Sequence, residues 1–95
     1  MIYIISYDLN KSGQDYNRLY NAIKSCSTSW CHFLDSTWLI DSSYSASTIQ
    51  ETIRKCTDNN DLFVIMEVTR NYSGWLPQKA WDWIHQHLGL SLINK

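Results

Sequence analysis

Three aspartates are candidate metal ligands, because each lies at the end of an apolar segment that predicts a β-strand. Asp8 and Asp41 each follow such a segment, and Asp61 precedes another. Carboxylate oxygens are the ligands that hard divalent cations such as Mg²⁺ prefer. If these strand ends meet at one edge of a sheet, as we expect, they form a candidate Mg²⁺ site. The alternative is that they serve as cap or turn residues, which is common for Asp in loops.

Other polar residues give weaker signals. Asp35 and Ser36 separate two aromatic-rich segments, which predicts the tight turn of a hairpin, and we place this turn at the sheet edge opposite the one that holds the first aspartate. Cys26 and Cys31 with His32 could be imagined as metal ligands. They lack the paired short spacing of zinc sites, so the cysteines are expected to be small buried residues.

The pattern of apolar residues predicts seven elements that position these side chains. Short β-branched and aromatic runs indicate strands, and apolar residues spaced three and four apart indicate helices. Ser47 with Gln50 three residues later fits a capping box near the start of the second helix. The predicted elements are, in order, strand 2–7, helix 15–24, strand 30–34, strand 37–40, helix 46–57, strand 62–68 and helix 78–88.

This order predicts an α+β fold of one domain spanning residues 1–95. Two strand–helix–strand halves are typical of the ferredoxin-like βαββαβ sandwich, here with an additional C-terminal helix. The predicted core covers residues 1–76, and the Trp-rich helix covers residues 77–89. In this arrangement we expect the strands 2–7 and 37–40 to lie side by side and parallel in the middle of the sheet.

The strand 2–7 is apolar on both faces, although two helices can cover only one face of a sheet. A partner subunit or the third helix must therefore cover the other face, and we expect a homodimer. The residues predicted on this second face are Ile2, Ile4, Phe63 and Ile65. Three tryptophans are expected in the core or an interface rather than in a base-stacking platform, and they are Trp38, Trp75 and Trp81.

Composition narrows the classes of function. The chain has 95 residues with 44% hydrophobic and 18% charged residues, which excludes intrinsic disorder. The net charge of −1 lacks the basic excess that phosphate binding favours, so it counts against a free-standing nucleic-acid binder. Three cysteines without CxxC pairing predict a reducing environment. With no signal peptide and no membrane span expected, the prediction is a cytoplasmic protein without membrane contact.

Three segments also carry a resemblance to a known family. They are ISYDLN at 5–10, LDSTWLI at 34–40 and NYSGWLP at 71–77. With them the chain resembles the small CRISPR-associated adaptation subunit, Cas-two, and more closely the short Cas-two-like proteins called SinR-like. The resemblance covers roughly residues 1–76. It stops at the Trp-rich helix, where the family has a strand that crosses to the partner.

The resemblance implies a site and an assembly. In the Cas-two family the aspartate that ends the first strand is the proposed metal ligand, supplied once by each subunit of a symmetric dimer. Asp8 matches that position, so the resemblance implies Asp8 as the catalytic and metal-binding residue and Mg²⁺ as the cofactor. Family members are described as metal-dependent nucleases or as structural subunits that hold DNA.

Two hypotheses of function follow. The first is a non-catalytic homodimer that binds nucleic acid, a nucleotide or another protein. The second is a Mg²⁺-dependent endonuclease for RNA or DNA, in which Asp8 of each subunit holds the ion and the ion activates water. The net charge favours the first hypothesis, and Asp8 favours the second.

Overall fold

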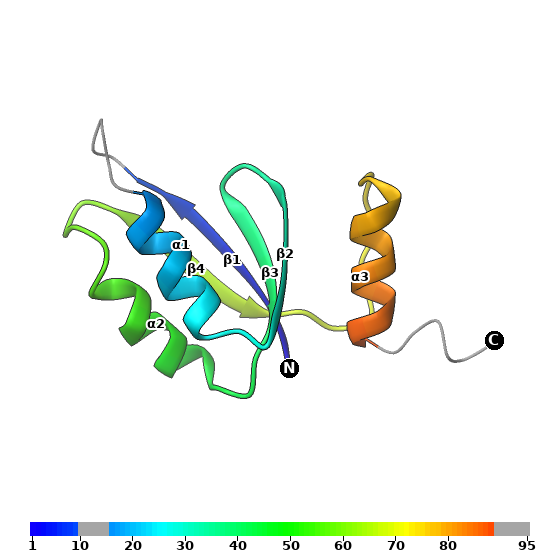
Figure 1. The fold of residues 1–95 in the computed structure, drawn as a ribbon, viewed down its shortest axis with the longest axis horizontal. Coiled ribbons are helices and arrows are strands. Elements are labelled where there is room, and N and C mark those ends of the chain that lie inside the picture. Colours follow the sequence, from blue (N-terminus) through cyan, green and yellow to red (C-terminus); the bar gives the residue numbers. More distant parts are fainter. Residues whose placement is uncertain (10–15, 89–95) are drawn as a thin grey trace.

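A computed structural model describes residues 1–9 and 16–88 and contains the seven predicted elements in the predicted order. Figure 1 shows their arrangement. The elements are β1 (Ile2–Asp8), α1 (Tyr16–Ser25), β2 (Ser29–Leu34), β3 (Thr37–Asp41), α2 (Ala46–Arg54), β4 (Leu62–Glu67) and α3 (Gln78–Leu88). In the described part of the chain, no helix is both long and apolar enough to cross a membrane.

The four strands form one sheet in the order β2-β3-β1-β4, and every neighbouring pair is antiparallel. The prediction that β1 and β3 run parallel is therefore wrong. The turn of Asp35 and Ser36 joins β2 to β3 and forces these two strands to be antiparallel, as a tight hairpin must. Because β3 lies between β1 and β2, and β1 reaches β2 through a helix crossover, β3 must run opposite to β1 as well.

The helices α1 and α2 cover one face of the sheet, which we call the helix face. Alternate β1 residues Tyr3, Ile5 and Tyr7 pack there against apolar residues of both helices. Phe63 and Ile65 pack on this same face, because they pair with Tyr7 and Ile5 across the sheet. Their predicted position on the second face is therefore wrong. Trp38 is only 2% exposed and lies in this core, as predicted.

The start of α2 differs in detail from the predicted capping box. Ser45 is the N-cap residue, and its hydroxyl accepts a hydrogen bond from the backbone N–H of Thr48 at 3.2 Å. This geometry satisfies one of the free N–H groups of the first turn, so Ser45 has the capping function that the sequence predicts for Ser47. The helix ends at Arg54 rather than at Thr57.

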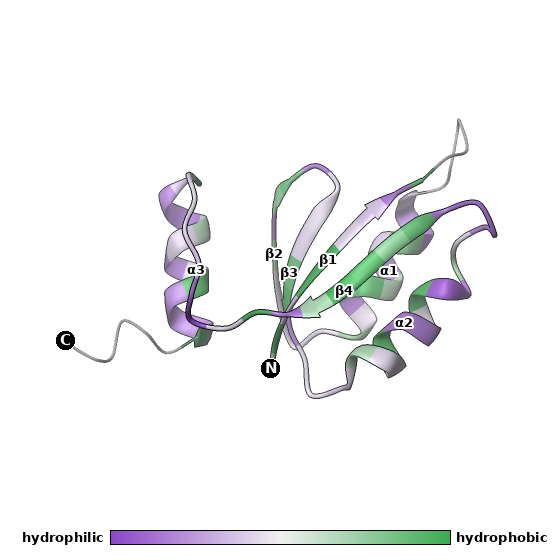
Figure 2. Cartoon of the chain, turned by 180° about the vertical axis from the view of Figure 1, so that it is seen from behind, coloured by the Kyte–Doolittle hydropathy of each residue, from purple (hydrophilic) through white to green (hydrophobic). Residues whose placement is uncertain are grey.

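The second face of the sheet, which we call the open face, lies away from α1 and α2. In Figure 1 the strands separate α3 from the other two helices. A linker of residues 68–77 leads from β4 to α3. Leu62, Val64 and Met66 of β4 pair with Asp8, Ser6 and Ile4, so they belong to the open face. Although β4 is an edge strand, it is strongly apolar (Figure 2).

Candidate functional site

Asp8 lies at the C-terminal end of β1, where its side chain is exposed. The strand register places it opposite Leu62, on the same face as Ile2 and Ile4. It borders a shallow hollow of about 280 Å³, which is lined by Ser6, Tyr7, Asp8, Leu62, Phe63 and Val64. Asp8 is thus accessible and lies beside the apolar part of the open face.

Asp41 does not join Asp8. It pairs with Ile2, at the opposite end of β1, so the predicted rim of three carboxylates is wrong. The physical reason is the antiparallel direction of β3, which sends the C-terminal end of β3 away from Asp8. Asp41 instead contacts α3, where its Oδ2 lies 2.9 Å from Nδ1 of His87.

Asp61 does lie at the same end of the sheet as Asp8, because Leu62 follows it and pairs with Asp8. Its side chain is only 3% exposed, and its Oδ2 accepts a hydrogen bond from the backbone N–H of Asp58 at 2.8 Å. This contact closes the turn before β4, which is the cap-and-turn alternative raised from the sequence.

The hairpin turn lies at the Asp8 end as well, not at the opposite edge as predicted. The backbone N–H of Tyr7 donates a hydrogen bond to the carbonyl of Ser36 at 3.0 Å. The Tyr7 hydroxyl donates to the carbonyl of Asp35 at 3.3 Å. Because β3 runs antiparallel to β1, Asp41 lies at the far end of the sheet from Asp8. The first residues of β3 and the hairpin turn therefore lie at the Asp8 end.

The two cysteines near His32 are separated by the sheet. Cys26 packs in the core on the helix face, whereas Cys31 lines a groove on the open face. Both are buried, as predicted, and burial raises the pKa of the Cys31 thiol. His32 stacks on Trp38 with ring centroids 4.1 Å apart. Within residues 1–9 and 16–88, no group of three or more His, Cys, Asp or Glu is placed to hold a metal ion.

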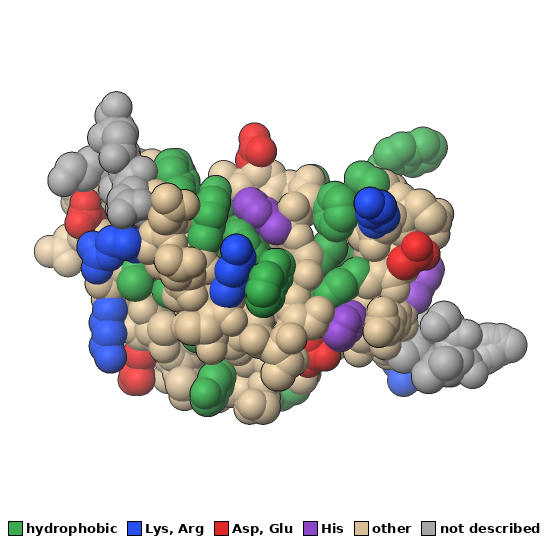
Figure 3. Space-filling model, viewed as in Figure 1, with side chains coloured by type: hydrophobic (Ala, Val, Ile, Leu, Met, Phe, Trp, Pro, Cys, Tyr) green, Lys and Arg blue, Asp and Glu red, His purple; other side chains and the backbone are tan. Residues whose placement is uncertain are grey.

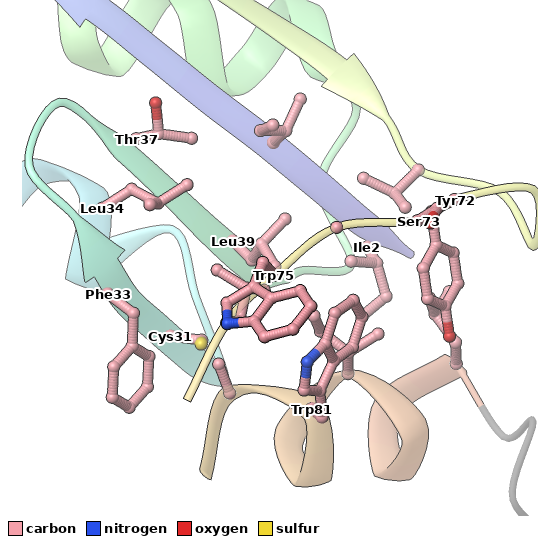
Figure 4. Close-up of a pocket in the computed structure, with 17 residues that line it drawn as sticks. Ile2, Cys31, Phe33, Leu34, Thr37, Leu39, Tyr72, Ser73, Trp75 and Trp81 are labelled. Atoms are coloured by element: carbon pink, nitrogen blue, oxygen red, sulfur yellow. The ribbon is translucent and has the colours of Figure 1, made fainter. Parts of the chain in front are cut away.

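An apolar groove of about 320 Å³ lies on the open face, between the sheet and α3. Figure 4 shows β1, β2 and β3 on one side of it and the linker with α3 on the other. Its lining residues are Ile2, Ile4, Cys31, Phe33, Leu34, Thr37, Leu39, Val68, Tyr72, Ser73, Gly74, Trp75, Leu76, Ala80, Trp81, Ile84 and Leu88. None of these residues is Asp, Glu, Lys, Arg or His, so the groove suits an apolar occupant.

Two polar contacts hold α3 against the sheet beside this groove. The indole Nε1 of Trp83 donates a hydrogen bond to the hydroxyl of Ser29 at 2.9 Å, and His87 contacts Asp41. The rings of Trp83 and His87 also stack, with centroids 4.2 Å apart. Figure 3 shows hydrophobic side chains at the boundary between the sheet and α3. These contacts hold α3 against β2 and β3, and the apolar groove lies between α3 and the sheet.

The amino-acid sequence did not predict this groove, although its pattern placed Trp81 in a core or an interface. Trp81 lines the groove and stacks on Tyr72, with ring centroids 6.1 Å apart. Trp75 also lines the groove but is 98% exposed, so it is not a core residue. The sequence feature that pointed to this region was the apolar second face of β1, which another element or a partner has to shield from water.

Comparison with known proteins finds no matching family model and no matching curated sequence.

Proposed function

We propose that this chain is a non-catalytic, protein-binding module that works as a homodimer in the cytoplasm, built on the ferredoxin-like plan of the Cas-two-like proteins. Read from β4, the strand order is β4-β1-β3-β2, which supports that plan. The three cysteines are free thiols, which supports a reducing compartment.

The apolar open face carries this proposal. Leu62 and Met66 on β4 are 64% and 58% exposed, and Met66 pairs with Ile4, which lines the apolar groove. Contiguous apolar surface of this kind marks protein interfaces on soluble proteins. A second copy of the chain is the first partner we assign to this face, because both copies then hide the same surface from water.

A protein occupant fits the groove better than a nucleic acid or a nucleotide. Phosphate groups require Lys, Arg or clustered backbone N–H groups, and phosphate contacts dominate nucleic-acid affinity. The described residues that line the groove include no Lys or Arg. The net charge of −1 also disfavours binding to a polyanion such as a nucleic acid.

Light scattering on the purified chain tests the assembly. The expected mass at high micromolar concentration is twice the 11.2 kDa of one chain. A mass of 11.2 kDa at that concentration contradicts the homodimer. Labelled RNA and DNA, incubated with and without Mg²⁺, test the absence of catalysis, and Mg²⁺-dependent cleavage would contradict it.

A second candidate function is a Mg²⁺-dependent phosphodiesterase, and the position of Asp8 favours it. Asp8 is exposed on the face that we assign to the dimer, so a two-fold axis near β1 would bring two carboxylates together. Each chain would supply one carboxylate, and Mg²⁺ bound between them would activate water and neutralise charge on the phosphate. Asp61 is already engaged in its turn and adds no ligand to this site in the described contacts.

A further inference from the structure

Trp75 differs from every other large apolar side chain in the described part of the protein. Its exposed fraction is 98%, whereas the other exposed large hydrophobic side chains range from 42% to 64%. It lies on the linker between β4 and α3, at the rim of the apolar groove. Its indole therefore stands in water at the edge of the groove, where so large an apolar ring is unfavourable.

We propose that Trp75 of one copy inserts into the groove of a second copy, and that a two-fold axis makes this contact reciprocal. The inference rests on the proposed homodimer and names the anchor of its interface. One chain supplies both a protruding ring and a hole beside it, on the same side of the molecule. A self-complementary patch of this kind is what a two-fold interface requires.

The groove matches an indole in size and in chemistry. Its volume of about 320 Å³ falls within the ~300–1,000 Å³ typical of pockets that hold whole ligands. Ile4 and Leu39 offer aliphatic surface on the sheet side, and Trp81 offers a ring on the α3 side. Aromatic rings buried in apolar pockets at the centre of an interface are the usual binding hot spots.

The area also suits a second copy. A buried indole hides roughly 150–250 Å². Two reciprocal insertions then supply roughly 300–500 Å² of the ~1,200–2,000 Å² that a stable interface buries. The exposed β4 side chains Leu62, Val64 and Met66 share the open face and extend the apolar surface beyond the groove. A partner seated in the groove can cover this row as well.

Sedimentation of Trp75→Ala tests the anchor, with Trp30→Ala as the matched control. Trp30 is 42% exposed and pairs with Ile40, which places it on the helix face. Trp75→Ala should raise the dimer dissociation constant at least about a hundredfold, because it removes two hot-spot rings per dimer. Trp30→Ala should leave the constant unchanged. At concentrations where all are monomers, Trp75→Ala should melt like the wild type because its ring is exposed. Trp30→Ala should melt at a lower temperature, because its ring is more than half buried and lies 5.3 Å from Nζ of Lys24.

Mixing two defective variants distinguishes exchange between copies from a ring that folds into its own groove. Leu39→Trp fills the groove but keeps Trp75, whereas Trp75→Ala keeps the groove but lacks the ring. Each variant alone should be a monomer at a concentration where the wild type is a dimer. Their mixture should form a heterodimer through one intact contact, with an affinity between those of the wild type and of either variant.

The outcomes separate this inference from the function that it rests on. A wild-type chain that stays monomeric at high micromolar concentration overturns both. Wild type and Trp75→Ala that dimerise equally well overturn the Trp75 anchor and leave the homodimer standing. A mixture of the two variants that does not associate also overturns the reciprocal insertion.

Discussion

The indole nitrogen of Trp38 donates a hydrogen bond to the hydroxyl of Tyr7 across 3.2 Å, in the core between the sheet and its two helices. The Tyr7 hydroxyl in turn donates to the carbonyl of Asp35 at 3.3 Å. Burial raises the pKa of Tyr7 from 10.0 to about 12, an effect that the bond from Trp38 partly opposes. The folded state thus holds the Tyr7 proton more tightly than the unfolded state does.

This difference predicts how stability depends on alkaline pH. The contribution of Tyr7 is fully present below pH 10, the unfolded value, and it is lost as the pH rises through about 12. The free energy of unfolding should fall by roughly 1–3 kcal/mol over this window through Tyr7 alone. Denaturant titrations at several pH values measure the slope.

Tyr7→Phe should lower stability at neutral pH, because it leaves the Trp38 N–H without its acceptor, and it should flatten the alkaline slope. Tyr44→Phe is the matched control, because Tyr44 is exposed and its hydroxyl lies outside the core. It should keep the wild-type slope. An unchanged slope in Tyr7→Phe would show that other groups cause the alkaline loss.

The order and rough bounds of the elements could be predicted from the sequence, because periodicity is a local property. The direction of β3 is not local, although the hairpin turn of Asp35 and Ser36 already implied it. A tight turn reverses the chain, so the end of β3 at Asp41 had to leave the edge occupied by Asp8. The hairpin turn makes β2 and β3 antiparallel, and the crossover through the first helix makes β1 and β2 parallel. Both features together fix the direction of β3 relative to β1.

The candidate groove could not be predicted in the same way. On β3, strand alternation places Trp38 on one defined face, and its burial follows from the helices on that face. The linker 68–77 has no period, so the direction of Trp75 depends on how α3 docks. That docking rests on contacts between residues far apart in the sequence, such as Trp83 with Ser29.

Trp38 is buried and Trp75 is exposed, so truncation of each to Ala should change the free energy of unfolding by very different amounts. Trp38 is 2% exposed, stacks on His32 and donates to Tyr7. Trp38→Ala should cost about 3–5 kcal/mol of unfolding free energy, because it leaves a large cavity in the core. Trp75→Ala, measured on the monomer, should change that free energy by less than about 0.5 kcal/mol. Urea titrations monitored by circular dichroism give both free energies. Similar losses of stability in the two variants would contradict a buried Trp38 and an exposed Trp75.

The contact between His87 and Asp41 predicts a local effect on α3. Nδ1 of His87 lies 2.9 Å from Oδ2 of Asp41, and the His87 ring stacks on Trp83. His87→Ala should lower the free energy of unfolding by only about 1 kcal/mol, because the pair is partly exposed to solvent. Hydrogen exchange should nevertheless speed up along α3 and not in β1 or β3. Gln86→Ala, an exposed neighbour on the same helix, should leave exchange unchanged.

Asp8 separates the two candidate functions, and Asp8→Asn keeps the shape of the side chain while removing its charge. If the chain is the non-catalytic module that we propose, millimolar Mg²⁺ should not raise the melting temperature of the wild type, because no ion binds the folded state preferentially. Asp8 is exposed, so Asp8→Asn should change the free energy of unfolding by less than about 0.5 kcal/mol.

A phosphodiesterase would behave differently in the same experiments. Mg²⁺ at about a hundred times its dissociation constant would stabilise the wild type by about 2.7 kcal/mol, and Asp8→Asn would lose both this stabilisation and any cleavage. Asp35→Asn is the matched control, since Asp35 is an exposed aspartate in the hairpin turn at the same end of the sheet. A Mg²⁺-dependent melting shift that Asp35→Asn keeps and Asp8→Asn loses would favour the enzyme. The absence of that shift counts against Mg²⁺ bound at Asp8 and leaves the apolar face as the functional surface that we propose.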